Sequence, residues 1–78
     1  MNKNRLRTIK KYFNDARLER AFMKLMVQVD IYNRPIAIAL INLSETEIME
    51  LKMFYNGCTY NRLLEKLQND IEYILELE

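Results

Sequence analysis

Apolar side chains recur at helical spacing near the start of the chain. Leu6, Ile9 and Phe13 follow one another at intervals of three and four residues, and basic side chains lie between them. This spacing predicts one apolar stripe on a basic helix within residues 3–13. The Asn-Asp pair that follows favours the end of that helix or the cap of a new one.

Residues 16–31 fit two periods. A helix would gather six residues on one apolar face: Leu18, Ala21, Phe22, Leu25, Met26 and Val29. A strand would gather six alternate residues instead: Ala21, Met23, Leu25, Val27, Val29 and Ile31. β-Branched residues become frequent only from Val27 onward, which favours a strand in the second half of the segment.

A turn separates this segment from a second apolar run. Residues 32–35 read Tyr-Asn-Arg-Pro, and asparagine tolerates left-handed backbone conformations while proline fixes φ. Residues 36–41 are then all apolar. Two strand-like runs around a four-residue turn are typical of a β-hairpin. We therefore predict a strand over residues 22–31 that pairs with a strand over residues 36–42.

The clearest helix signal begins at Ser44. Ser44 and Glu47 fit a capping box, in which each side chain satisfies a backbone N–H of the other residue. Leu43 before the cap can pack on Ile48, as in a hydrophobic staple. Gly57 predicts the end of this helix, because glycine adopts the left-handed conformation at little cost.

A final helix is predicted over residues 60–77, with Thr59 as its N-cap. Its apolar residues have the spacing of a short coiled-coil seam: Tyr60, Leu64, Leu67, Ile71 and Ile74. A helix this apolar lies between two elements or packs on a second chain. These five residues are therefore candidate interface residues, either of an intramolecular clasp over the hairpin or of a homodimer.

In order along the chain, these elements predict an α+β fold. Residues 1–78 form one small domain, in which a basic N-terminal helix or arm within residues 1–14 precedes a β-hairpin and two C-terminal helices (αββαα).

Residues 43–67 resemble the first two helices of LuxR-type and sigma-factor helix-turn-helix segments. Six residues match core, turn and cap positions of those families: Leu43, Leu51, Gly57, Thr59, Leu63 and Leu67. The resemblance implies a recognition helix after Leu67. Residues 68–78 contain no Lys or Arg and four acidic residues. Because phosphates repel acidic groups, this helix is not predicted to read DNA.

Residues 35–77 also resemble ribbon-helix-helix repressors, which run strand, capped helix, glycine turn, helix. The resemblance implies an obligate dimer whose strand reads bases through alternate polar residues. Here one strand face would be Ile36, Ile38 and Leu40, and the other would be Ala37, Ala39 and Ile41. Neither face can hydrogen-bond a base edge.

Size and composition restrict how such a domain is stabilised. A 78-residue chain buries only about 60% of its unfolded surface, so small domains often need a staple. Cys58 is the only cysteine and histidine is absent, which leaves no intrachain disulfide and no set of zinc ligands. We therefore expect a homodimer.

The single free cysteine, and the lack of a signal peptide or a long apolar run, favour a soluble, cytoplasmic protein.

The same composition argues against catalysis. Histidine, the usual acid or base near neutral pH, is missing, and Gly57 is the only glycine, so no glycine-rich loop can hold phosphates. We predict no enzyme activity and no cofactor. Cys58 is expected to be an inert, partly buried thiol, or else a thiolate stabilised at a helix start.

Charge is distributed unevenly along the chain. Residues 1–24 carry eight basic and two acidic side chains, a net of +6, whereas residues 25–78 carry four basic and nine acidic ones, a net of −5. This asymmetry indicates either ordinary solvation and pairing within the domain or a basic surface for a polyanion. The candidate polyanion-binding residues are Arg5, Arg7, Lys10, Lys11, Arg17 and Arg20.

Two hypotheses for function follow. The first is a non-enzymatic regulator or inhibitor, of the kind carried by phages and mobile elements, that binds a protein partner stoichiometrically. Five methionines and five tyrosines would supply adaptable contact surface. The alternative is a dimeric DNA-binding transcriptional regulator, either ribbon-helix-helix-like or dependent on the basic arm.

Overall fold

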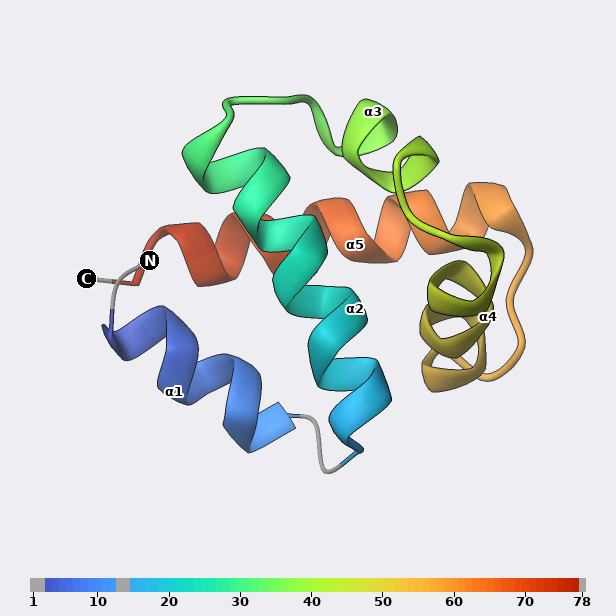
Figure 1. The fold of residues 1–78 in the computed structure, drawn as a ribbon, viewed down its shortest axis with the longest axis horizontal. Coiled ribbons are helices and arrows are strands. Elements are labelled where there is room, and N and C mark those ends of the chain that lie inside the picture. The colour runs from blue at the N-terminus through green and yellow to red at the C-terminus, as the bar shows by residue number, and fades with distance from the viewer. Residues whose placement is uncertain (1–2, 13–14, 78) are drawn as a thin grey trace.

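All regular structure is helical in the computed structural model, which describes residues 3–12 and 15–77 (Figure 1). The elements are α1 (Lys3–Tyr12), α2 (Ala16–Met26), the π-helical η1 (Val27–Ile31), α3 (Ile36–Ile41), α4 (Glu45–Phe54) and α5 (Tyr60–Leu75). None of the described residues lies in a strand. The predicted α+β fold and its β-hairpin were therefore wrong.

The segment assigned to the first strand is helix α2 and its continuation η1. Asp15 caps α2, because its carboxylate accepts a hydrogen bond from the backbone N–H of Arg17 at 2.7 Å. The buried residues of α2 are five of the six in the helical alternative: Leu18, Ala21, Phe22, Leu25 and Met26. The sixth, Val29, is partly buried in η1. One face of an amphipathic helix thus accounts for the apolar pattern, and the two-residue alternation does not.

The β-branched residues that suggested a strand lie in the π-helical turn. In η1 the backbone N–H of Tyr32 bonds to the carbonyl of Val27 at 3.2 Å, and that of Arg34 bonds to the carbonyl of Gln28 at 3.0 Å. Asn33 then adopts a left-handed conformation with φ 55°. The turn chemistry of residues 32–35 was recognised correctly, but the turn joins two helices.

The second predicted strand is the six-residue helix α3. Its residues Ala39 and Leu40 are fully buried, whereas Ile38 is 48% exposed. In a strand Ile38 and Leu40 would share one face, so their different burial follows from the helical period. A short, fully apolar run is compatible with both structures, and tertiary packing decides between them.

Both predicted caps in the second half of the chain are confirmed. The Ser44 hydroxyl accepts from the backbone N–H of Glu47 at 3.2 Å, and the Glu47 carboxylate accepts from that of Ser44 at 2.8 Å. Thr59 caps α5 in the same way through the N–H of Arg62. Gly57 and the preceding Asn56 have φ values of 69° and 62°, so the chain turns through two left-handed residues.

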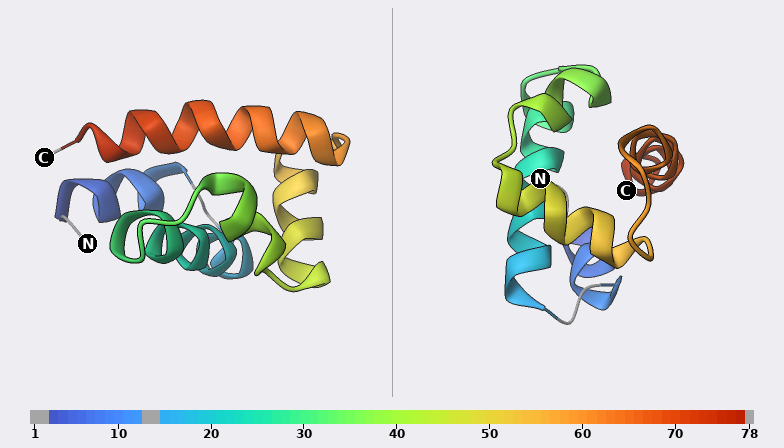
Figure 2. Two further views of the ribbon diagram at one scale, coloured as in Figure 1. Left: turned by 90° about the horizontal axis from the view of Figure 1, so that it is seen from above. Right: turned by 90° about the vertical axis from the view of Figure 1, so that its right-hand side faces the viewer.

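Helix α5 lies along one side of the other helices, as the first view of Figure 2 shows. The core fills the space between them and receives buried side chains from all five α-helices and from Leu43 before α4. In the described chain it contains no buried polar or charged residue. None of the described helices has the length and apolarity needed to span a membrane.

Candidate binding surfaces

Arg5, the first candidate for polyanion binding, is held inside the protein. Its guanidinium donates to Asp30 Oδ2 at 2.7 Å, to the carbonyl of Leu75 at 2.8 Å and to that of Leu77 at 3.2 Å. Only 18% of the Arg5 side chain and 18% of the Asp30 side chain is exposed. Arg5 therefore fastens α1 to η1 and to the end of α5.

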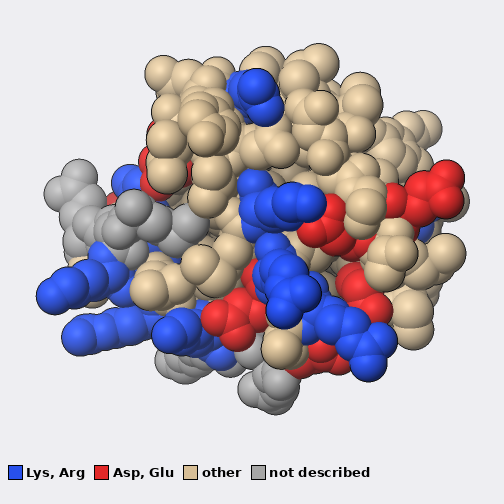
Figure 3. Space-filling model, in the orientation of Figure 1, with Lys and Arg blue, Asp and Glu red and all other residues tan. Residues whose placement is uncertain are grey.

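The other basic candidates lie on the surface of α1 and α2. Arg7 and Lys10 on α1, and Arg17 and Arg20 on α2, are all exposed. Lys3 on α1 and Lys24 on α2 are exposed as well. Lys11 lies in α1, and its side chain is outside the described part of the structure. Figure 3 shows Lys and Arg gathered over these two helices with acidic side chains between them.

Acidic groups on the same surface moderate its charge. Lys24 pairs with Glu47 of α4 at 3.2 Å. Asp15 is the N-cap of α2, and Glu19 lies in its first turn. The backbone N–H of Ser44 and the ammonium group of Lys24 hold the pKa of Glu47 below its usual range. Lys and Arg thus gather over α1 and α2 on the face that Figure 3 shows, and the acidic groups among them keep this face from being uniformly positive.

The predicted seam of α5 is mostly interior. Leu67, Ile71 and Ile74 lie in the core of the monomer, Leu64 is half-buried, and only Tyr60, at 36%, is exposed. Helix α5 uses these residues to cover α1, α3 and α4. The sequence left open whether the seam packs within the chain or on a second chain. The structure buries three of its five residues within the chain.

An apolar surface that the sequence did not indicate lies over η1 and α3. Four large side chains form it, and we call it the η1–α3 surface: Ile31, Tyr32, Ile38 and Ile41 are 57%, 61%, 48% and 66% exposed. Between Ile31 and Leu43 the only charged residue is Arg34. In Figure 3 the corresponding upper part of the molecule is almost free of charged groups.

Polar side chains hold this surface in shape. Gln28 Oε1 accepts from Arg34 Nη1 at 2.6 Å and from Asn42 Nδ2 at 3.3 Å, so one amide links η1 to both ends of α3. The guanidinium of Arg34 also lies 5.4 Å from the centre of the Tyr32 ring, within the range of a cation–π contact. These contacts therefore join η1 to α3, the two elements from which the apolar side chains project.

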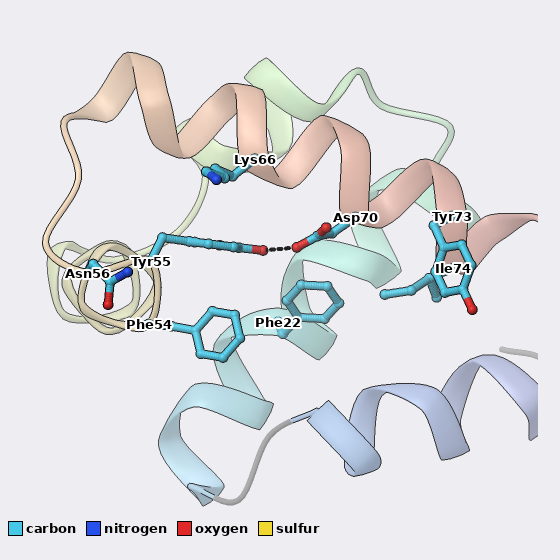
Figure 4. Close-up of a pocket in the computed structure, with 8 residues that line it drawn as sticks. All are labelled: Phe22, Phe54, Tyr55, Asn56, Lys66, Asp70, Tyr73 and Ile74. Atoms are coloured by element: carbon cyan, nitrogen blue, oxygen red, sulfur yellow. Dashed lines mark hydrogen bonds between the residues drawn. The ribbon is translucent and has the colours of Figure 1, made fainter.

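A pocket of about 350 Å³ opens between α2, α4 and α5 (Figure 4). Its residues are Phe22, Phe54, Tyr55, Asn56, Lys66, Asp70, Tyr73 and Ile74. Four of them are aromatic, and Phe54 and Tyr55 meet edge to face with ring centres 4.8 Å apart. Concave, mainly aromatic sites with a few polar groups are typical of ligand or side-chain binding sites.

One hydrogen bond crosses this pocket. The Tyr55 hydroxyl donates to Asp70 Oδ2 at 2.5 Å and connects the end of α4 to the middle of α5. Burial of the phenol, together with the neighbouring carboxylate, raises the pKa of Tyr55. The pair keeps the Asp70 side chain in a fixed position at the pocket.

Cys58 is half-buried and free, and no group of three or more metal-ligating side chains exists in the described ranges. Comparisons of the chain with protein-family models, with curated proteins and with solved structures found no match.

Proposed function

We propose that this protein is a non-enzymatic regulator that acts by stoichiometric binding to a protein partner through the η1–α3 surface. The observation that carries the proposal is the exposure of Ile31, Tyr32, Ile38 and Ile41 on adjacent elements whose surroundings are nearly uncharged.

Physical chemistry favours a covered rather than a solvated surface. Burial of one large aliphatic or aromatic side chain contributes about 1.5–3 kcal/mol, and contiguous apolar patches on small domains commonly mark interaction sites. The brace formed by Gln28, Arg34 and Asn42 lowers the entropy lost on binding, because the support is ordered beforehand.

Crosslinking in cell extract, followed by identification of the captured proteins, tests the proposal. The Ile38→Glu/Ile41→Glu variant should lose proteins that the unmodified chain captures, since two carboxylates would be buried at the interface. Met53→Glu on α4 is a matched control, because Met53 is 66% exposed, as Ile41 is. Capture that is the same for all three proteins, or lost equally in both variants, would contradict a role for this surface.

A second candidate function is polyanion binding by the surface of α1 and α2. The observation that favours it is the exposure of Arg7 and Lys10 on α1 and of Arg17 and Arg20 on α2, two helices that contact each other and over which Figure 3 shows Lys and Arg gathered. These side chains would contact phosphates without reading sequence.

Fluorescence anisotropy with a labelled DNA duplex at several salt concentrations tests this candidate. Binding should weaken with a log–log slope of about −0.9 per phosphate contact. An Arg7/Lys10/Arg17/Arg20 alanine variant should lose most of that slope, whereas the Ile38→Glu/Ile41→Glu variant should retain it. Arg5 is left unchanged because its loss would disturb the fold. Absence of binding at low salt would reject this second function.

A further inference from the structure

The pocket between α2, α4 and α5 combines aromatic walls with one fixed carboxylate. Phe22, Phe54, Tyr55 and Tyr73 supply the rings, and Asp70 supplies the carboxylate. We propose that this pocket binds the guanidinium group of an arginine side chain presented by a protein partner. The inference rests on the proposed protein-binding function and adds the chemistry of one contact.

The aromatic rings suit a flat cation. In Figure 4 the Tyr55–Asp70 pair lies above the rings of Phe54 and Phe22, while Tyr73 and Ile74 lie to the right of these rings. The planes of Phe54 and Tyr55 differ by 78°, so the two rings do not stack face to face on each other. Arginine stacks on aromatic faces, and its aliphatic stem packs on apolar side chains such as Ile74.

Asp70 provides the charge that selects a cation. The Tyr55 hydroxyl occupies one position on Oδ2, but a carboxylate offers about four acceptor positions. Its remaining positions can receive the parallel N–H groups of a guanidinium, an arrangement that arginine forms and lysine cannot. The bond from Tyr55 orients the carboxylate before any ligand arrives.

Lys66 is the opposing charge in the same pocket. It lies one helical turn before Asp70 on α5 and is exposed, and no ion pair within 4.0 Å joins it to Asp70. Its ammonium group therefore leaves Asp70 accessible while lowering the attraction for a second cation. Removal of the Lys66 charge should strengthen the binding of arginine, a result that an apolar ligand would not give.

The experiment compares two small probes of the same shape. Acetyl-arginine amide and acetyl-citrulline amide are titrated into ¹⁵N-labelled protein, and amide shifts of residues at the pocket are followed. Arginine amide should shift residues near Phe54, Asn56 and Asp70 in a saturable way, and neutral citrulline amide should bind about tenfold more weakly, because it lacks the charge-assisted contact.

Three variants complete the test. Asp70→Asn keeps an acceptor for the Tyr55 hydroxyl and should weaken arginine binding about tenfold. Lys66→Gln should strengthen it about two- to threefold at low salt. The Ile38→Glu/Ile41→Glu variant should bind arginine amide as the unmodified protein does. The spectrum of each variant shows directly whether the fold is retained.

The outcomes distinguish failure of the guanidinium site from failure of the function proposed for the η1–α3 surface. Equal binding of arginine and citrulline amides, or no shifts at the pocket, would overturn the guanidinium site. Insensitivity of arginine binding to both Asp70→Asn and Lys66→Gln would overturn it as well. None of these outcomes affects capture through the η1–α3 surface. Capture that is unchanged in the Ile38→Glu/Ile41→Glu variant, together with normal arginine binding, would overturn the proposed function alone.

Discussion

The Arg5 side chain joins elements that are far apart in the sequence, a role that its neighbouring residues do not indicate. Its guanidinium satisfies two carbonyl groups at the end of α5 and one carboxylate of η1, groups that are 25 and 70 or more residues away along the chain. Carbonyls in the last turn of a helix have no intrahelical partner. Arg5 therefore acts as a cap supplied from a distant element.

Replacement of Arg5 is expected to destabilise the protein. Arg5→Ala should lower the free energy of unfolding by about 2 kcal/mol, because it leaves a partly buried Asp30 carboxylate and two carbonyls without their donor. Arg5→Lys should recover only part of the loss, since an ammonium group lacks the guanidinium fork. Urea unfolding measures the change, and Arg7→Ala, at an exposed position of the same helix, should stay within about 0.5 kcal/mol.

Glu47 should make stability depend on pH in a defined direction. The backbone N–H of Ser44 lowers the pKa of Glu47 in the folded state, so the unfolded state takes up its proton at a higher pH. The resulting stabilisation is present above the ordinary glutamate pKa of about 4.3 and is lost as pH falls through the folded value. The difference in unfolding free energy between the unmodified protein and Glu47→Gln should therefore narrow between pH 7 and pH 3. A constant difference would contradict this assignment.

At the scale of elements, residues 22–42 show where sequence patterns are insufficient. The caps at Ser44 and Thr59 act within three residues, so local chemistry identifies α4 and α5. The run at residues 36–41 carries no cap and is apolar throughout, so its own residues fit a strand as well as a helix. Its helical form depends on packing against α5 and α2.

A pair of substitutions in α3 distinguishes helix from strand in solution. Ile38→Glu should leave the unfolding free energy within about 0.5 kcal/mol, whereas Leu40→Glu should prevent folding, because Leu40 is fully buried. A strand would place both residues on one face, and the two variants would then respond alike. Circular dichroism and urea unfolding of the two proteins give the answer.

At the scale of the whole molecule, helix α5 closes a core to which every other α-helix contributes. The heptad-like spacing of its apolar residues indicated correctly that this face packs against something. It could not show whether the partner is the same chain or a second one, because both bury the same periodic face.

The η1–α3 surface was missed for a related reason. Ile31, Ile38 and Ile41 belonged to predicted strands and Tyr32 to the predicted turn, and a wrong period assigns exposure to the wrong residues.

The buried position of the α5 seam predicts how its loss affects the protein. Leu67→Ala should lower the unfolding free energy by about 3 kcal/mol through the cavity it leaves, with a urea midpoint that does not depend on protein concentration. Tyr60→Ala, at the exposed end of the seam, should have a smaller effect. A midpoint for Leu67→Ala that rises with protein concentration would instead indicate that this face joins two chains.

The contacts of Arg5 also decide how the ends of the protein open. Helix ends normally fray independently of one another, but here Arg5 on α1 donates to the carbonyl of Leu75, the last residue of α5, and to that of Leu77 after it. Fraying of either end must break the same bonds, so the first helix and the last turn of α5 should open as one cooperative unit. Native-state hydrogen exchange would detect this as similar opening free energies for amides at both ends of the chain, and Arg5→Ala would release the two ends from each other.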